Sequence, residues 1–328
     1  MKILVTGGCG FIGHHFVEHV LKNTDYQIYI FDKLTYAASG LDRIRDFLYV
    51  HDDKRISFFS VDLTRPISEG IVKECSDVDY IFHLAAETHV DNSITNPLLF
   101  VYSNAVGTTN ILDFARKCDN LKAFHYGSTD EVFGPAPEGN SYKEWDRYNS
   151  SNPYSAAKAS GEEIVLSYMN TYKLPGYITH LVNCIGERQN VEKFVPLCIR
   201  KILAGETIDI HGTPDGKKSG SRFYIHARNA SDAILWLSQK FEQREKYNIT
   251  SEKEITNLEL AQMIAGFMGK ELKYRIVNFH QSRPGHDLRY ALDGSKLASM
   301  GYKIPLTIED SLRKTVEWTL NNRKWLEM

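Results

Sequence analysis

Several features are missing from this sequence, and each absence excludes a class of protein. No stretch approaches the roughly 18 consecutive apolar residues that a membrane-spanning helix requires. The first residues, MKILVTGG, lead directly into a strand-like run, so we expect neither a signal peptide nor a membrane partner. Lys and Arg number 39 and Asp and Glu number 41, and the formal net charge of -2 gives no reason to expect nucleic acid as a partner.

Cysteine is sparse, and metal-ligand spacing is missing. Five cysteines lie far apart and include no C-x-x-C pair, which argues against a disulfide framework or a zinc ribbon. The 12 histidines are scattered without ligand spacing, so we predict no metal. Reduced thiols are typical of the cytoplasm, where we expect the protein to work. The sequence also lacks internal repeats and low-complexity tracts.

What is present is a regular alternation of short apolar runs with helix-length amphipathic segments. Such an alternation indicates strand–helix–strand units and a parallel sheet that helices cover on both faces. Strands are predicted at 2–6, 27–32, 56–60, 80–84, 122–127 and 177–183, and helices at 11–21, 41–50, 67–75, 98–117 and 154–171. We therefore predict an α/β fold whose first domain, residues 1–184, is a Rossmann-type doubly wound sheet.

The pattern loosens after this point. Helices are predicted at 193–204, 229–241, 258–268 and 307–321, with short strands at 208–211 and 223–225 and a loop rich in Gly, Lys and Ser at 212–221. Mixed elements that follow a parallel sheet usually form a substrate-binding part. We assign residues 185–328 to a smaller, mixed C-terminal substrate-binding domain, some segments of which return to the first domain.

The first predicted strand leads into a glycine-rich turn with G-x-x-G-x-x-G spacing. It runs through Gly7, Gly10, Phe11, Ile12 and Gly13. Glycine allows a sharp turn, a close approach of backbone N–H groups to a pyrophosphate, and tight packing of the next helix. The helix N-terminus then faces the phosphates with its positive dipole end. The spacing predicts a dinucleotide site.

Later residues refine the cofactor prediction. Asp32 closes the second strand, where a carboxylate suits an adenosine ribose and repels a 2′-phosphate, so NAD is favoured over NADP. Asp62 and Leu63 follow the third strand, near the expected adenine. Ala85 and Ala86 follow the fourth strand, where a bulky side chain would meet the bound dinucleotide.

Two acids follow the fifth strand in the segment Ser-Thr-Asp-Glu. Open parallel sheets bind ligands beyond the carboxyl ends of their strands, which is where Thr129, Asp130 and Glu131 lie. Adjacent acids can perform separate proton transfers when their surroundings separate their pKa values. A solvated loop is the alternative that this pattern leaves open.

A tyrosine and a lysine begin the next predicted helix. Asn152 suits the N-cap and Pro153 the first turn, so Tyr154 and Lys158 lie one turn apart on one face. A nearby ammonium stabilises a phenolate and would lower the tyrosine pKa from about 10 toward the working pH. The pair predicts a general base for an alcohol.

Together these segments resemble a known family. The motifs TGGCGFIG, HLAAETHVD, STDEVFG and YSAAK, with Asp32, are similar to those of extended short-chain dehydrogenase/reductases. The Thr-Asp-Glu step resembles the nucleotide-sugar 4,6-dehydratases, and the likeness continues through RFYI, SRPGHD and TVEW. Epimerases of this superfamily usually lack both acids, and UDP-glucuronate decarboxylases typically have Ser at the position of Asp130.

The resemblance implies a lyase with tightly bound NAD that makes a 4-keto-6-deoxy sugar. Tyr154 would take the proton of the sugar 4-hydroxyl, Lys158 would tune Tyr154 and hold the nicotinamide ribose, and Thr129 would bind the same sugar oxygen. Glu131 would remove the C5 proton, and Asp130 would protonate the departing 6-hydroxyl. Hydride would pass from C4 to NAD and return to C6.

The resemblance also implies substrate contacts and an assembly. Arg222 and Arg283 are the candidates for the nucleotide diphosphate, because guanidinium groups fork onto phosphate oxygens. Asn104, Asn183 and Lys193 match positions near the sugar or diphosphate. A homodimer is implied, built partly from the helices at 98–117 and 154–171.

Two departures from the family pattern leave the sugar open. The run Asn183-Cys184-Ile185 stands where many dTDP-glucose dehydratases have a pair of Asn followed by Tyr, and the loop at 212–221 is longer and more basic than usual. The candidate substrates are therefore dTDP-glucose, UDP-glucose and UDP-N-acetylglucosamine. The alternatives are an epimerase, a 5,6-dehydratase or a decarboxylase of the same superfamily, and a catalytically silent NAD-binding protein.

Overall fold

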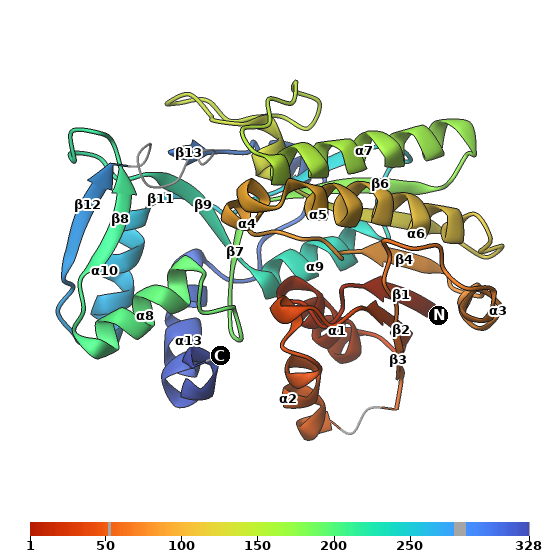
Figure 1. The fold of residues 1–328 in the computed structure, drawn as a ribbon, viewed down its shortest axis with the longest axis horizontal. Coiled ribbons are helices and arrows are strands. Elements are labelled where there is room, and N and C mark those ends of the chain that lie inside the picture. Colours follow the sequence, from red (N-terminus) through yellow and green to blue (C-terminus); the bar gives the residue numbers. More distant parts are fainter. Residues whose placement is uncertain (52–53, 279–286, 328) are drawn as a thin grey trace.

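A parallel sheet forms the frame of the larger part of the molecule in the computed structural model, which describes residues 1–51, 54–278 and 287–327. Within these residues seven strands pair in the order β10-β6-β5-β4-β1-β2-β3, and every pairing is parallel (Figure 1). Their bounds are β1 Lys2–Thr6, β2 Gln27–Asp32, β3 Ile56–Ser60, β4 Tyr80–His83, β5 Ala123–Thr129, β6 Gly176–Leu181 and β10 Lys246–Ile249. The strand order reverses between β1 and β4, which is where doubly wound sheets bind ligands.

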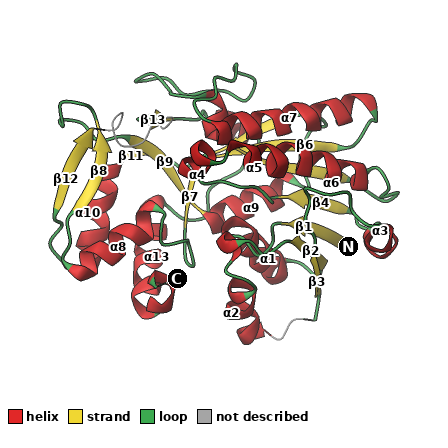
Figure 2. Cartoon of the chain, viewed as in Figure 1, coloured by secondary structure: helices red, strands yellow, loops and turns green. Residues whose placement is uncertain are grey.

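Helices cover both faces of this sheet (Figure 2). In β1, Ile3 and Val5 pack in one apolar cluster with α1 (Phe11–Asn23) and α9 (Ala227–Leu237). Leu4 packs in a second cluster with α6 (Gly107–Ala115) and α7 (Pro153–Thr171). Alternate residues of a strand point to opposite faces, so two apolar cores follow directly from the sequence of a fully buried strand. The predicted fold class is confirmed.

The helical segment predicted at 98–117 is interrupted. It consists of α5 (Pro97–Val101), a π-helical turn η2 (Tyr102–Val106) and α6 (Gly107–Ala115). A π turn inserts one residue into the helical repeat and is often found at functional sites. Side-chain periodicity does not reveal it, because the apolar pattern continues through the turn.

The smaller part contains two further sheets, at the left of Figure 1. One has the order β11-β9-β13, with β7 paired to β9, and the other pairs β12 with β8. These strands are β7 Asn183–Ile185, β8 Ile208–Gly212, β9 Ser221–His226, β11 Glu254–Thr256, β12 Tyr274–Asn278 and β13 Arg289–Tyr290. A third apolar cluster lies beneath them and includes Ile199 of α8 (Phe194–Ala204), Ile264 of α10 (Asn257–Met268) and Leu312 of α13 (Ile308–Asn321).

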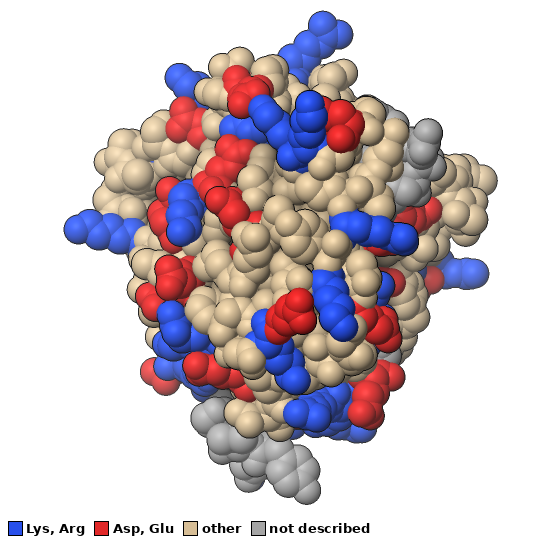
Figure 3. All heavy atoms as spheres, turned by 90° about the vertical axis from the view of Figure 1, so that its left-hand side faces the viewer, with Lys and Arg blue, Asp and Glu red and all other residues tan. Residues whose placement is uncertain are grey.

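The remaining described helices are short or lie beside the large sheet. They are η1 Tyr36–Ala38, α2 Asp42–His51, α3 Glu69–Cys75, α4 Val90–Thr95, η3 Asp130–Phe133, α7 Pro153–Thr171, α12 Ser295–Ser299 and η4 Arg323–Leu326. None of the described helices is long and apolar enough to cross a membrane. Figure 3 shows basic and acidic side chains intermixed on one face of the molecule, in keeping with the small net charge.

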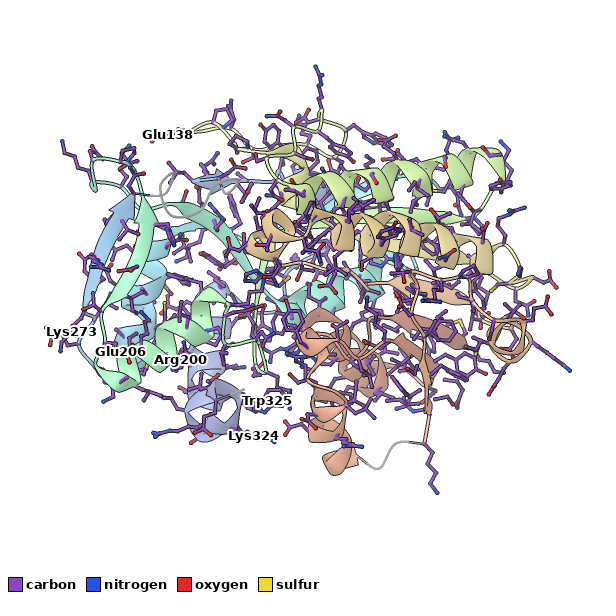
Figure 4. All side chains as sticks on the ribbon, in the orientation of Figure 1. Glu138, Arg200, Glu206, Lys273, Lys324 and Trp325 are labelled. Atoms are coloured by element: carbon purple, nitrogen blue, oxygen red, sulfur yellow. The ribbon has the colours of Figure 1, made fainter. Side chains whose placement is uncertain are left out.

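Two of the contacts that join the two parts of the chain involve β10 and the C-terminal segment. Strand β10 comes from the second half of the sequence and pairs with β6 of the large sheet, a strand that the sequence pattern did not predict. Near the C-terminus, Lys324 bonds to Asp46 of α2 at 2.6 Å and Trp325 lies against Arg43, with both labelled side chains on the side facing α2 in Figure 4. The 184/185 boundary stays a prediction, with β10 and α9 as segments that return to the large sheet.

A buried polar network links β10, at one edge of the large sheet, to β6 and α7. Glu162 of α7 has no exposed surface, and its Oε2 lies 3.2 Å from Nε2 of His180 and 3.3 Å from Nζ of Lys246. Tyr148 and Ser128 also donate hydrogen bonds to this carboxylate. Burial alone would raise the pKa of Glu162, but these partners lower it to about 2.

We predict that Glu162→Gln lowers the free energy of unfolding by about 3–5 kcal/mol, because it leaves the buried ammonium of Lys246 without its counter-charge. A depressed carboxyl pKa stabilises the fold above its unfolded value near 4.5, and this stabilisation is lost as the pH falls toward 2. Guanidinium unfolding at several pH values measures both effects. Glu163→Gln, one residue away on the exposed face, is the matched control and should change stability by less than about 0.5 kcal/mol.

Candidate active site

The glycine-rich turn packs so closely that two of its glycines have no room for a side chain. Gly7 has φ +68°, and a Cβ there would lie 2.7 Å from the Cα of Ala85. A Cβ on Gly13 would lie 2.0 Å from the carbonyl oxygen of Gly7. The first turn of α1 is therefore pressed against the end of β1, next to the end of β4, at the point where the strand order reverses.

Asp32 is held over this turn by two backbone donors. Its Oδ2 accepts from the N–H of Cys9 at 3.0 Å and its Oδ1 from the N–H of Leu34 at 2.8 Å. The side chain is almost fully buried, and burial raises its pKa despite these donors. The carboxylate is thus fixed at the end of β2, where the sequence pattern predicted it.

Most of the predicted cofactor residues gather around one cavity, whereas Tyr154 and Lys158, which were also predicted to contact the cofactor, are not in its lining. The lining includes Gly7, Gly10, Phe11, Ile12, Gly13, Asp32, Asp62, Leu63, Ala85 and Ala86. A cavity with a glycine turn and a helix N-terminus on one side and a carboxylate at the end of β2 fits a dinucleotide.

Other residues of the same cavity were not predicted from the sequence. They are Lys33, Tyr36, Arg43, Thr88, Ser103, Gln189 and Asn190, and the predicted substrate residue Lys193 lies with them. Lys33 directly follows Asp32, so its position could have been inferred from the strand end. Gln189 and Asn190 lie far along the chain in a loop, and no local pattern marks them.

The general-base candidate begins helix α7. The side-chain oxygen of Asn152 accepts from the N–H of Ser155 at 2.8 Å in a reciprocal capping box, and Pro153 occupies the first turn, as predicted. Tyr154 and Lys158 are 6% and 4% exposed. Thr129 hydrogen-bonds to the Tyr154 phenol, which joins β5 to the helix.

The protonation of this pair differs from the expectation. Burial raises the pKa of Tyr154, and the charge of Glu131 raises it further. Lys158 donates to the carbonyl oxygen of Gly127 at 2.7 Å and lies over the ring of Tyr126, so its ammonium is engaged away from the phenol. Burial lowers the pKa of Lys158 to about 7, which weakens its ability to stabilise a phenolate in the protein alone.

The two acids occupy the short turn after β5. Asp130 is 3% exposed, and burial followed by the charge of Glu131 raises its pKa to about 7. Burial also raises the pKa of Glu131, but Arg222 and a hydrogen bond from Asn152, at 3.5 Å to Oε2, oppose that rise. Asp130 is therefore protonated in a substantial fraction of molecules near neutral pH, whereas Glu131 has a donor and a cation that favour its ionised form.

The predicted substrate residues lie in different settings. Lys193, just before α8, is close enough for its charge to lower the pKa of Glu131. Arg222 donates to the carbonyl oxygens of residues 221, 287 and 288 and lies 4.5 Å from the ring centre of Tyr290. Arg283 lies outside the described residues.

Asn104 is placed by the π-helical turn, and its amide is used within the protein. Its Oδ1 accepts from the N–H of Glu87 at 2.9 Å and its Nδ2 donates to the carbonyl oxygen of Glu87 at 3.0 Å. These two bonds fix the chain just after Ala85 and Ala86 on the cofactor cavity. A direct contact between Asn104 and the substrate stays a prediction.

Several buried polar atoms near the acids have unused hydrogen-bonding capacity. Within the described residues, Oδ2 of Asp130 and Oδ1 of Asn183 are buried without a hydrogen-bond partner. The thiol of Cys184 lies close to both Asp130 and Tyr154. Polar atoms left unsatisfied at such a place are costly unless a ligand completes them, which fits a hydroxyl-bearing substrate. Among the described residues, no cluster of His, Cys, Asp or Glu side chains is suited to hold a metal ion.

A dinucleotide cleft, a Tyr-Lys pair and the parallel sheet define an extended short-chain dehydrogenase/reductase. The sequence profile of the GDP-mannose 4,6 dehydratase family matches residues 4–315, and the chain belongs to this family. The family predicted from the motifs, the nucleotide-sugar 4,6-dehydratases, is thus confirmed.

Similar proteins span the whole chain. The dTDP-glucose 4,6-dehydratase of Escherichia coli is 37% identical over 351 residues, covering 100% of this chain and 95% of that protein. The dTDP-glucose 4,6-dehydratase of Neisseria meningitidis is 36% identical and covers 99% of this chain and 94% of its own.

Solved structures agree in fold. The dTDP-glucose 4,6-dehydratase DesIV of Streptomyces venezuelae, solved with NAD bound, has a TM-score of 0.88 at 33% identity and covers 99% of this chain and 98% of its own. A UDP-glucose 4-epimerase of Thermus thermophilus, also with NAD, has a TM-score of 0.85 at 26% identity, with coverages of 97% and 98%. Because an epimerase shares the fold almost as well, the reaction must be argued from the acids.

We predict that Gly13→Ala weakens NAD binding by about tenfold or more and destabilises the fold by about 1–3 kcal/mol, because the new Cβ would clash with the carbonyl of Gly7. Titration with NAD and thermal unfolding measure the two effects. Gly70→Ala, in α3 with open space around its Cβ position, should leave NAD binding unchanged. Equal NAD affinity in Gly13→Ala and wild type would contradict the assigned site.

Proposed function

We propose that this protein converts dTDP-glucose to the 4-keto-6-deoxy sugar by removing water from C5 and C6. The dehydratase class and the NAD requirement agree with the full-length relatives and with the NAD-bound neighbours. The observation that carries the proposal is local: Thr129, Asp130, Glu131 and Tyr154 lie together at the carboxyl end of β5. This strand pairs with β4, after which Ala85 and Ala86 line the dinucleotide cavity. Epimerases of this superfamily usually lack both acids, so the pair Asp130 and Glu131 favours elimination.

Bound NAD supplies a hydride acceptor for C4 and a hydride donor for C6. The residues of the chain would move the protons. Tyr154 accepts the proton of the 4-hydroxyl, and Thr129, which already bonds to the phenol, holds the same sugar oxygen. The phenol pKa is raised in the protein alone, so we propose that Lys158 and the bound cofactor together make Tyr154 a base during the reaction.

The acids would then divide the elimination between them. The ketone at C4 acidifies the C5 proton, which Glu131 removes as a carboxylate. Asp130 has a pKa near 7 and is protonated in a large fraction of molecules at neutral pH, so it can donate to the departing 6-hydroxyl. This assignment uses each acid in the form that its surroundings favour.

The substrate test compares three sugar nucleotides. The purified protein is incubated with dTDP-glucose, UDP-glucose and UDP-N-acetylglucosamine, and the products are weighed by mass spectrometry. We expect loss of one water from dTDP-glucose. Water loss from UDP-N-acetylglucosamine alone would move the proposal to that sugar, which the small Cys184 beside the acids could admit. An isomer of unchanged mass would identify an epimerase instead.

We predict that Glu131→Gln slows product formation by about 10²–10⁴-fold but still permits oxidation at C4. Reduced nicotinamide should therefore accumulate on the enzyme after substrate is added, which its absorbance reports. Glu138→Gln is the control, because Glu138 lies on the exposed loop labelled at the top of Figure 4. Normal turnover of Glu131→Gln would refute the role of this residue as the base.

We propose a homodimer, which exposed apolar side chains on one side of the large domain support. Leu98, Val101 and Tyr102 are 64%, 43% and 54% exposed along α5 and η2, beside α7. A contiguous apolar patch of this kind is typical of a protein–protein interface. Sedimentation velocity should give twice the chain mass of 37.5 kDa, and a monomer would contradict the assembly. A cytoplasmic location stays a prediction.

A further inference from the structure

A buried tyrosine from the far end of the chain reaches the proposed base. Tyr290 is 3% exposed in β13, and its hydroxyl lies 3.4 Å from Oε2 of Glu131. The two residues are separated by 159 positions in the sequence. They meet because β13 pairs with β9, which places Tyr290 opposite Arg222.

The phenol ring is held from the side of the smaller domain. The guanidinium of Arg222 lies 4.5 Å from the ring centre, a distance suited to a cation–π contact. Arg222 is itself fixed by its bonds to the carbonyl oxygens of Asp287 and Leu288. The Tyr290 hydroxyl is therefore presented to Glu131 by a rigid pair of strands.

Two donors converge on one oxygen of Glu131. Asn152 donates from Nδ2 at 3.5 Å and Tyr290 from its hydroxyl at 3.4 Å, and both reach Oε2. Within the described part of the chain no donor reaches Oε1. The carboxylate is thus oriented, with Oε2 bound by the protein and Oε1 left to accept a proton.

The phenol also has a second possible acceptor. The Asp287 carboxyl lies close to the same hydroxyl, and its Oδ2 is buried without a hydrogen-bond partner among the described residues. A phenol has only one proton to donate. Donation to Glu131 therefore competes with donation to Asp287. The other charged and titratable groups around Glu131 are Asp130, Tyr154, Lys193 and Arg222.

We propose, building on the function proposed above, that Tyr290 is a positioning residue for Glu131. Its hydroxyl donates to Oε2, keeps the carboxylate ionised and directs Oε1 toward the C5 proton of the substrate. When Glu131 takes that proton, the carboxyl becomes neutral and the phenol proton is free to turn to Asp287. The smaller domain in this way contributes to the chemistry as well as to binding.

The proposal predicts a defect in one step only. A hydrogen bond to the charged form of an acid lowers its pKa, so removing the hydroxyl should raise the pKa of Glu131. Proton removal at C5 should become slower. Because this step needs ionised Glu131, the pH at which its rate rises should be higher than in the wild type. Oxidation at C4 does not use Glu131 and should continue.

The test is Tyr290→Phe in the full-length protein loaded with NAD and given dTDP-glucose. We expect C5 deprotonation to slow by about ten- to a hundredfold, and we measure it as the exchange of deuterium from the solvent into C5. Reduced nicotinamide should accumulate on the enzyme. The acid limb of the pH–rate profile should shift to higher pH, and KM should change little. Tyr302→Phe is the matched control, because that buried phenol bonds to Asp232 at 3.0 Å and does not contact the acids.

The outcomes separate this inference from the proposed function. If the wild type dehydrates none of the three sugars, the proposed function fails. Suppose that the wild type is active and that Tyr290→Phe accumulates no reduced nicotinamide and has the same acid limb of the pH–rate profile as the wild type. The positioning role of Tyr290 is then wrong. Equal slowing of C4 oxidation and C5 deprotonation would likewise overturn it, because a general structural defect affects both steps.

A second variant decides the matter if Tyr290→Phe does not fold. Asp287→Asn weakens the competing acceptor, because a neutral amide oxygen accepts less strongly than a carboxylate oxygen, and it removes a negative charge that raises the pKa of Glu131. We expect its acid limb to move to lower pH, the opposite direction to Tyr290→Phe. An upward shift or no shift would contradict the proposed competition for the phenol proton.

Discussion

The parallel alignment of β1, β4 and β5 is the constraint on which the site depends. Because their carboxyl ends meet at one edge, the glycine turn after β1, the alanines after β4 and the acids after β5 lie along the same edge of the sheet. The packing there is tight enough to fix the spacing: a Cβ on Gly7 would meet Ala85, the residue that follows β4 closely. Helix α7 then adds its tyrosine through the hydrogen bond to Thr129 at the end of β5.

Burial determines the chemistry at this edge. It raises the pKa of both acids and of Tyr154, and it lowers the pKa of Lys158 to about 7. All four groups are thereby moved toward their neutral forms. A site of this kind holds protons at little electrostatic cost and can pass them to and from a sugar whose hydroxyls are neutral. The difference between the two acids comes from Arg222 and Asn152, which favour charge on Glu131.

Much of this site could be predicted because its signals are local. The glycine spacing, Asp32 at a strand end and the cap of α7 each depend on a few adjacent residues, and the structure places them as expected. The direction of the Tyr154 pKa could not be predicted, because it depends on burial and on Gly127, whose carbonyl engages the ammonium of Lys158. Spacing along a helix predicts that two side chains lie on one face, but it does not predict the hydrogen-bond acceptor of each side chain.

Residues whose positions depend on long-range strand pairing could not be predicted from the sequence, for a different reason. Strand β10 is short and joins the large sheet only through β6, and Gln189 reaches the cofactor cavity from a loop. Tyr290 belongs to a two-residue strand, too short for any periodicity to mark it. Its place beside Glu131 follows from the pairing of β13 with β9.

That pairing has a consequence for the way the two domains cooperate. Glu131 belongs to the large domain, whereas Arg222 and Tyr290, which favour its charge and fix its orientation, belong to the smaller one. Because these contacts are already present in the protein alone, Glu131 is oriented before a substrate binds, and the binding energy of the substrate is not needed to order it.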